Sequence, residues 1–298
     1  MEVHDQPHFS FPVEQGKVRE FLQATLPLLH AAGLPDIGAD GWIHRAPTVF
    51  SRVADFHQPE GGSLADLMDS KPPRLRHAGH RWHVRSPLRI GETYRVVGWR
   101  VLDSVEKQGR DGLPFRLVTA ERSFLDQHGV EVLQEQGIIA VLGPREAASA
   151  LPTLSEAANE PCEPTRWNAD WRNAAVGTEL ADITVPRLGL TDIVRFAGAI
   201  GDFNPIHHDP AAARASGLPD IIAMGMLACT LASLAVEQAC GAGMLASLSV
   251  RFREPLFAER PLRLRITATA EAGSGPAVAI EGMSGSVPIL SMTASARP

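Results

Sequence analysis

The chain has 298 residues, of which 44% are hydrophobic and 21% are charged, and its formal net charge is −6. A chain of this length can bury more than one hydrophobic core, so we expect two domains. An acidic chain lacks the basic face that phosphate binding requires, which excludes nucleic acid as an expected partner.

The sequence predicts neither secretion nor a membrane span. Its first residues, MEVHDQPHFSFPVEQG, place acids and histidines where a signal peptide has basic and then apolar residues. The longest uncharged run, Ile221 to Val236, is shorter than a bilayer span and contains Gly225, so it predicts a buried helix and no membrane partner. The cysteines Cys162, Cys229 and Cys240 are too scattered for a disulfide framework or a zinc site, which favours a reducing, cytoplasmic location.

Residues 80–142 predict an antiparallel meander. Strand-like segments are separated by turn residues at 109–112 and 128–129; they read HRWHVRSPLRIG, ETYRVVGWRVLD, LPFRLVTAERSFLD and VEVLQEQGIIAVL. The last third of the chain repeats the scheme with LASLSVRFREPL, PLRLRITATAE, AVAIEGMS and VPILSMTAS. Each set follows a helical segment, and strands in a run after helices favour an α+β fold over a doubly wound parallel sheet.

A surface connection is predicted between the two sets of strands. The segment PREAASALPTLSEAANEPCEPTRWN is rich in Pro, Ala, Ser and Glu and has no apolar periodicity. We therefore predict an N-terminal domain over residues 1–147, a linker over 148–175 and a C-terminal domain over 176–298.

The two halves carry traces of a duplication. HAAGLPDI in the first half parallels RASGLPDI in the second, and VREFLQA around Phe21 parallels IVRFAGA around Phe196. Phe21 lies twelve residues before Gly33, whereas Phe196 lies twenty-one residues before Gly217. The second half therefore contains an extra loop, and that loop carries the sequence GDFNPIHHDP.

This polar loop is predicted to lie between two short helices. Thr191-Asp192 is expected to cap the helix IVRFAGAI, which Gly201 would end in a left-handed conformation. Asp209-Pro210 is expected to start the helix AAARAS. A third helix, Gly225 to Cys240, is apolar nearly all round and is expected to be the buried central helix of its domain.

Three interpretations of the loop compete. An ordinary turn explains its Asp, Asn, Pro and Gly residues, but not His207 or an acid five residues earlier. A metal site is disfavoured because adjacent histidines point in different directions and no helical i, i+4 pair is present; its ligands would be Asp202, His207, His208 and Asp209. Acid–base catalysis by Asp202 and His207 is favoured, because Pro205 and the flanking helices would hold the pair rigidly.

At these residues the sequence resembles the MaoC-type, or (R)-specific, enoyl-thioester hydratase/dehydratase family of the hotdog fold. The family signature Gly-Asp-x-Asn-Pro-x-His is present as Gly201, Asp202, Asn204, Pro205 and His207. The longer stretch FAGAIGDFNPIHHDPAAARASGLPDIIAMGML and the segment SVRFREPL are also similar to the family. In RAPTVF, SPLRIGE and VEKQGRDG the first half resembles the degenerate, FAS1-like dehydratase hotdog of two-domain members.

The resemblance implies an α+β fold of two tandem hotdog domains, each an antiparallel sheet wrapped on a central helix, which together form a pseudo-dimer. It implies reversible hydration of trans-2-enoyl thioesters to 3-hydroxyacyl thioesters, with Asp202 and His207 holding the water and Asn204 orienting them. The backbone N–H of Gly225 would stabilise the thioester oxygen. Substrate contacts are implied for Gly201, Pro205, Met224 and Met226. The sequence departs from the family at Ile200, where a small hydroxyl residue is usual, and at Met224, where His is frequent.

The implied partner is an acyl-CoA or an acyl carrier protein substrate, so coenzyme A or phosphopantetheine enters with the substrate and no separate cofactor or metal is expected. Two joined hotdog halves fit either a monomer or a homodimer of such chains. Two other functions stay open: a hotdog acyl-CoA thioesterase, and a non-catalytic acyl-thioester binding subunit of a complex.

A locally basic stretch, RLRHAGHRWHVRSPLR, has two interpretations. It could contact the phosphates of coenzyme A or an acidic carrier protein, or it could be a solvated strand edge blunted by charge; its arginines are Arg74, Arg76, Arg81, Arg85 and Arg89. The histidines of this region are expected at the surface: His77, His80 and His83. Three tryptophans are expected in the core or at an interface: Trp42, Trp82 and Trp99.

Overall fold

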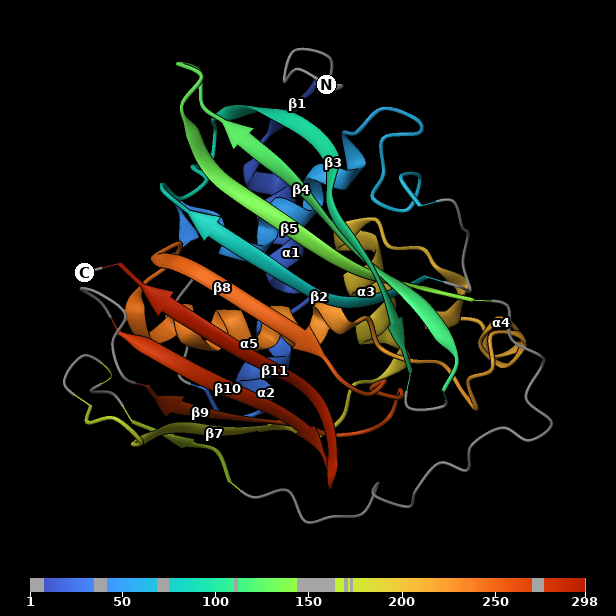
Figure 1. The fold of residues 1–298 in the computed structure, drawn as a ribbon. Coiled ribbons are helices and arrows are strands. Elements are labelled where there is room, and N and C mark those ends of the chain that lie inside the picture. Colours follow the sequence, from blue (N-terminus) through green and yellow to red (C-terminus); the bar gives the residue numbers. More distant parts are fainter. Residues whose placement is uncertain are drawn as a thin grey trace.

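The computed structural model describes residues 8–34, 42–68, 75–109, 112–143, 164–168, 171, 174–269 and 276–297. An antiparallel sheet of 11 strands runs through the molecule in the order β1-β3-β4-β5-β2-β8-β11-β10-β9-β7-β6 (Figure 1). The first half supplies β1 (His8–Pro12), β2 (Leu75–Val84), β3 (Thr93–Gln108), β4 (Pro114–Leu125) and β5 (Glu131–Leu142). The second half supplies β6 (Arg166–Trp167), β7 (Glu179–Val185), β8 (Leu245–Phe252), β9 (Leu262–Ala268), β10 (Ala277–Ser284) and β11 (Val287–Ala296).

The strand order of the first half is repeated in the second half, in the opposite direction across the sheet. The series β1-β3-β4-β5-β2 in the first half corresponds to β7-β9-β10-β11-β8 in the second. β2 and β8 pair in antiparallel register, with Trp82 opposite Leu248, and so join the halves into one sheet. This arrangement confirms the predicted α+β fold of two hotdog units forming a pseudo-dimer. Most of the predicted linker, 148–175, lies outside the described residues.

The predicted meander over 80–142 is correct only for its last three strands. β3, β4 and β5 pair in sequence order, but β2 pairs with β5 and not with β3. The reason is that the other edge of β2 is taken by β8, so β2 has no edge left for β3. The expectation that this basic strand would be a charge-blunted sheet edge is therefore wrong.

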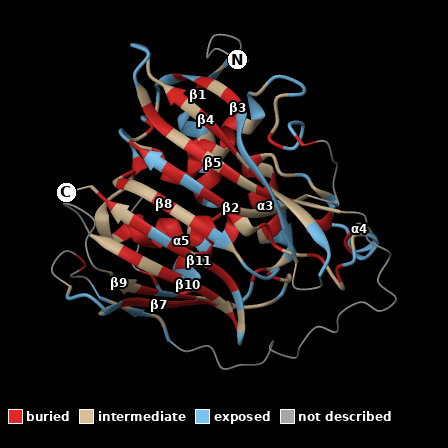
Figure 2. Ribbon diagram, in the orientation of Figure 1, coloured by how far each residue is buried: buried red, intermediate tan, exposed pale blue. Residues whose placement is uncertain are grey.

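Helix α5 (Gly225–Cys240) packs on the inner face of the sheet, and the other helices lie around it or at one end of the molecule. The other helices are α1 (Gln15–Gln23), α2 (Leu26–Ala31), α3 (Leu190–Ile200), α4 (Pro210–Ala215) and the 3₁₀ helices η3 (Thr48–Phe56) and η5 (Pro205–His207). α5 lies along β8 and β11 (Figure 1), and every residue from Met226 to Gln238 is buried. The prediction of a buried central helix is thus confirmed. Every second residue of β9 is buried, as a strand with one face on the core requires (Figure 2).

Histidines of β2 differ in exposure. His83 is exposed, as expected, but the prediction that His80 lies at the surface is wrong, because the inner face of a central strand is covered. Nε2 of His77 lies 3.2 Å from Nδ1 of His80, whose ring stacks on Trp82. Burial lowers the pKa of His80 to about 4, so the ring is neutral at pH 7. The three tryptophans expected in the interior are buried: Trp42, Trp82 and Trp99.

None of the helices in the described part of the chain has the length and apolarity that crossing a bilayer requires.

Candidate active site

The candidate site begins where α3 ends. Gly201 takes the predicted left-handed conformation, with φ of 75°, and directs the chain into Asp202. The predicted start of this helix is wrong: α3 begins at Leu190, and Gly189 is its N-cap residue. Asp192 lies inside the first turn, where its Oδ2 accepts the backbone N–H of Gly189 at 3.0 Å. The carboxylate therefore stabilises the helix start from within, as the acid of a capping box does.

The polar side chains of the loop hold its backbone. Oδ1 of Asp202 accepts the N–H of Asn204 at 3.3 Å, and Oδ1 of Asn204 accepts the N–H of Ile206 at 3.4 Å. Asn204 is thereby the N-cap of η5, and Pro205 is its first residue. His207 is the last residue of η5, so the Asn204 cap supports the turn that carries the imidazole.

His207 is held in one tautomer. Its side chain is nearly buried, and its Nδ1 donates a hydrogen bond to the carbonyl oxygen of Ile222 at 2.7 Å. A carbonyl can only accept, so Nδ1 carries the proton and Nε2 of the neutral ring has a free lone pair. Sequence reasoning missed Ile222, since a backbone carbonyl has no signature in the side-chain pattern.

Asp202 and His207 face one another. Nε2 of His207 lies 3.8 Å from Oδ2 of Asp202, and the carboxylate is partly exposed, with 39% of its side chain accessible. This separation is too long for a direct hydrogen bond. A single water oxygen can nevertheless lie within hydrogen-bonding distance of both atoms, one on each side. The structure thus brings together the acid and the imidazole that the sequence singled out.

The start of α5 is linked to His207 through the backbone. Ile222, whose carbonyl holds the imidazole, precedes Gly225 by three residues. Gly225 is the first residue of α5, so its N–H has no acceptor within the helix, and its N-cap residue, Met224, makes no side-chain capping bond. A Cβ at Gly225 would lie 2.9 Å from the Phe252 ring, which explains why glycine stands here.

The predicted substrate contacts differ in exposure. Met224 and Met226 are buried at the start of α5, Gly201 is half-buried and Pro205 is exposed. The alternative metal set is not assembled: Oδ1 of Asp209 caps α4 by accepting the N–H of Ala211 at 2.8 Å. Across the ranges that the structure describes, no three His, Cys, Asp or Glu side chains group as metal ligands.

Two residues of the first half pack against the start of the loop. The Phe56 ring at the end of η3 packs so closely on Gly201 that a Cβ there would lie 3.0 Å from it. Nζ of Lys17 lies 4.2 Å from the centroid of this ring and donates to the carbonyl of Gly198 at 3.3 Å. These contacts could not be predicted from the sequence, since Phe56 and Lys17 lie outside every motif.

The corresponding helix start in the first half is occupied. Arg45 and Ile222 each form an isolated β-bridge, and in both halves a helix starts three residues later. Thr48, the first residue of η3, therefore corresponds to Gly225, the first residue of α5. The N–H of Thr48 donates to Oε1 of Glu237 at 3.0 Å, and the N–H of Gly243 donates to Oε2 at 2.8 Å. Burial raises the pKa of the Glu237 carboxyl to about 7. The first half therefore has no polar loop between α1 and α2, and the start of η3 already has an acceptor.

Two family models match the chain. The model described as MaoC like domain matches residues 173–278, and the model described as FAS1-like, dehydratase domain region matches residues 4–135. No curated protein matches the chain.

Several solved structures share the fold. A MaoC-like dehydratase is 20% identical with a TM-score of 0.73, and the match covers 98% of this chain and 96% of that one. HtdX of Mycobacterium tuberculosis is 18% identical with a TM-score of 0.63, covering 98% and 100%. A third structure, a Mycobacterium tuberculosis protein described as having a double hotdog fold, is 13% identical with a TM-score of 0.60, covering 98% and 95%. These similarities establish the double-hotdog fold.

Proposed function

We propose that the chain is a hydro-lyase that interconverts trans-2-enoyl thioesters and 3-hydroxyacyl thioesters; its matches to the FAS1-like dehydratase region and MaoC like domain models support this. The observation that carries this proposal is the pair formed by Asp202 and His207, whose facing atoms are 3.8 Å apart in a loop braced on both sides by helices. The thioester belongs to coenzyme A or to the phosphopantetheine of a carrier protein, and the reaction needs no further cofactor.

In the hydration direction the pair holds the attacking water. Nε2 of His207 and the Asp202 carboxylate are both acceptors, so the two hydrogens of one water point to them and its oxygen lone pair points to the β-carbon. One O–H bond breaks as the C–O bond forms, and the released proton is delivered to the α-carbon. The Ile222 carbonyl stabilises His207 whenever its ring takes up the proton, because Nδ1 keeps its acceptor. Positioned acid–base groups of this kind contribute about 10² to 10⁴ in rate.

The thioester oxygen gains negative charge as the double bond reacts. In this proposal the N–H of Gly225 donates to that oxygen, and the dipole of α5 favours the same charge. Met224 in place of the histidine that is frequent in the family does not remove this donor, because the donor belongs to the backbone. Phe252 packs closely on Gly225 at the start of this helix.

The chemistry is assigned to a C-terminal domain over 176–298, and the N-terminal domain over 1–147 supplies part of the wall. The occupied start of η3 supports a single site per chain, because the Glu237 carboxylate already accepts the Thr48 N–H. Gly201 and Pro205 of the loop, and Met224 and Met226 at the start of α5, are proposed as substrate contacts.

The test is the loss of enoyl-thioester absorbance when purified protein meets crotonyl-CoA and a longer trans-2-enoyl-CoA. Activity is expected in the wild-type protein, with 3-hydroxyacyl-CoA as the product and no free thiol. Asp202→Asn and His207→Ala should each lower kcat by about 10² to 10⁴, while His208→Ala, at an exposed neighbour, should not. Release of free thiol would instead identify a thioesterase. Binding of acyl-CoA without turnover of either coenzyme A or carrier-protein substrates would identify a binding subunit.

A further inference from the structure

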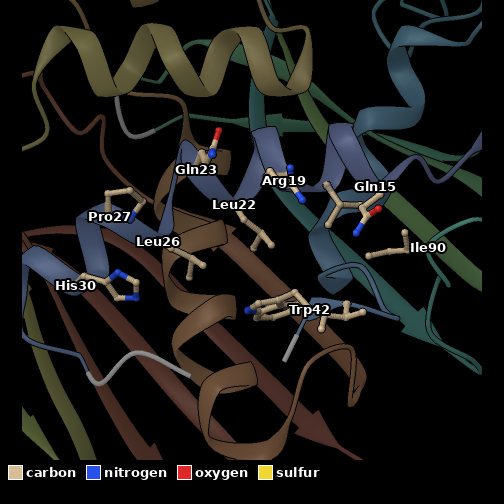
Figure 3. Close-up of a pocket in the computed structure, with 11 residues that line it drawn as sticks. Gln15, Arg19, Leu22, Gln23, Leu26, Pro27, His30, Trp42 and Ile90 are labelled. Atoms are coloured by element: carbon tan, nitrogen blue, oxygen red, sulfur yellow. The ribbon is translucent and has the colours of Figure 1, made fainter. Parts of the chain in front are cut away.

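A cavity of about 590 Å³ lies in the first half between α1, α2 and Trp42 (Figure 3). Its volume is in the range of small-molecule sites in proteins. None of the proposed catalytic groups lines it: Asp202, His207 and Gly225 all belong to the second half. The cavity is therefore a separate feature of the fold, and its function does not depend on the proposed reaction.

The cavity exists because the first half lacks the polar loop. In the second half nine residues, 201–209, join α3 to α4, and Ile206 of that loop packs against Ala213, Leu218 and Ile221. In the first half only Ala24 and Thr25 join α1 to α2. The space that Ile206 fills in one half thus has no corresponding side chain in the other.

The lining has an apolar part and a polar rim. Its apolar side chains include Val18, Leu22 and Leu26 from the two helices and Ile90 from the chain before β3, whereas Arg19 is exposed at the rim. Among the described residues that line the cavity, none is acidic. An occupant with an apolar chain and a negative charge fits this lining, because the chain is removed from water and the charge meets a guanidinium.

A second observation also points to a ligand. Trp42 is 97% buried, being 3% exposed, and its indole Nε1 has no hydrogen-bond partner among the described residues. Figure 3 shows the nitrogen end of the Trp42 ring turned toward His30, at the end of the cavity away from Ile90. Buried indole N–H groups normally find an acceptor, and none of the described residues supplies one at this end of the cavity.

We propose that this cavity is a second ligand site, and that it takes a medium-chain carboxylate. The carboxylate oxygen accepts the N–H of Trp42 at the His30 end, and the alkyl chain lies along Leu22 and Val18 toward Ile90. Arg19 at the rim adds favourable charge.

Calorimetric titration of the full chain with sodium decanoate, below its micelle concentration, tests the proposal. One molecule is expected to bind per chain, and the uncharged decan-1-ol should bind more weakly. Trp42→Phe keeps the ring but removes the donor and should weaken decanoate binding roughly tenfold. Trp171→Phe is the matched control, since Trp171 is also buried, its Nε1 has no partner among the described residues, and it does not line the cavity. Its affinity should equal that of the wild-type protein.

Two further variants separate this site from the catalytic loop and from a loss of folding. Leu26→Trp adds bulk at a partly exposed position of the cavity wall and should abolish binding while thermal unfolding stays cooperative. Asp202→Asn should bind decanoate as the wild-type protein does. The proposal is overturned by absent decanoate binding, by equal affinity in Trp42→Phe, or by loss of binding in Asp202→Asn, which would place the acid in the catalytic cleft.

Discussion

Phe21 of α1 and Phe196 of α3 pack on one another with ring centroids 5.9 Å apart and ring planes tilted by 52°. Both rings are fully buried, and they occupy the corresponding positions in the two parallel segments VREFLQA and IVRFAGA. The repeated residue of one half thus meets its counterpart in the other. Because α3 ends at Gly201, this contact also supports the helix from which the polar loop begins.

Phe196→Ala should lower the free energy of unfolding by about 3 to 5 kcal/mol, the range for removing a buried phenyl ring. Phe21→Ala should have a similar effect. Urea unfolding of both single variants and the double variant measures their coupling, which should be about 0.5 to 1.5 kcal/mol for an aromatic pair. Strictly additive losses would show that the two rings are packed independently.

Gly225→Ala should both strain the site and lower activity. The added Cβ would lie 2.9 Å from the Phe252 ring, so the ring or the helix start must shift. Overpacking of this kind costs about 1 to 3 kcal/mol of stability, and a displaced Gly225 N–H should lower kcat for the enoyl thioester. Thermal unfolding and steady-state kinetics check both effects.

A compensating variant tests whether the contact with Phe252 causes the losses of stability and activity expected for Gly225→Ala. Phe252→Leu combined with Gly225→Ala should recover part of the stability and part of kcat, because the smaller side chain leaves room for the Cβ. If the double variant is no better than Gly225→Ala alone, the close contact with Phe252 does not explain the glycine.

Asn204→Ala tests the positioning of His207. The variant loses the side-chain oxygen that accepts the Ile206 N–H, so η5 should be destabilised by about 1 kcal/mol. We expect kcat to fall while KM for the enoyl thioester changes little, because the imidazole is displaced but the substrate wall is intact. Asn204→Ser supplies another capping oxygen and should restore most of kcat. A loss as large in Asn204→Ser as in Asn204→Ala would point to a direct role of the amide.

The parts of the site that the sequence predicts are those determined locally. Gly201 ends α3 and Asp209 begins α4, and the preferences of these residue types for such positions are strong. The buried helix Gly225–Cys240 follows from its apolar composition. The acid and the imidazole could be found because they lie in the same short loop.

The parts that the sequence does not predict are contacts between distant segments. The Ile222 carbonyl that fixes His207 has no side-chain signal, and the Phe56 ring reaches Gly201 from the other half. The same limitation explains the error at His80, whose burial depends on the pairing of β2 with both β5 and β8. An isolated strand pattern contains no information on which edge another half of the chain will cover.

Glu237 should make the stability of the fold depend on pH. Its carboxyl is fully buried and joins the halves by accepting the N–H groups of Thr48 and Gly243, and burial raises its pKa from 4.5 to about 7. Between these two values the native state binds more protons than the unfolded chain, so stability falls as pH rises from about 4.5 to 7 and is level beyond that range. The whole change is on the order of 3 kcal/mol, since one pKa unit corresponds to about 1.4 kcal/mol.

Glu237→Gln cannot titrate, so urea unfolding at a series of pH values should show the stability of the wild-type protein declining relative to the variant over this window. A difference between the two proteins that stays constant from pH 4.5 to 7 would mean that the carboxyl titrates alike in the folded and unfolded chain, and that its two backbone hydrogen bonds offset the cost of burial.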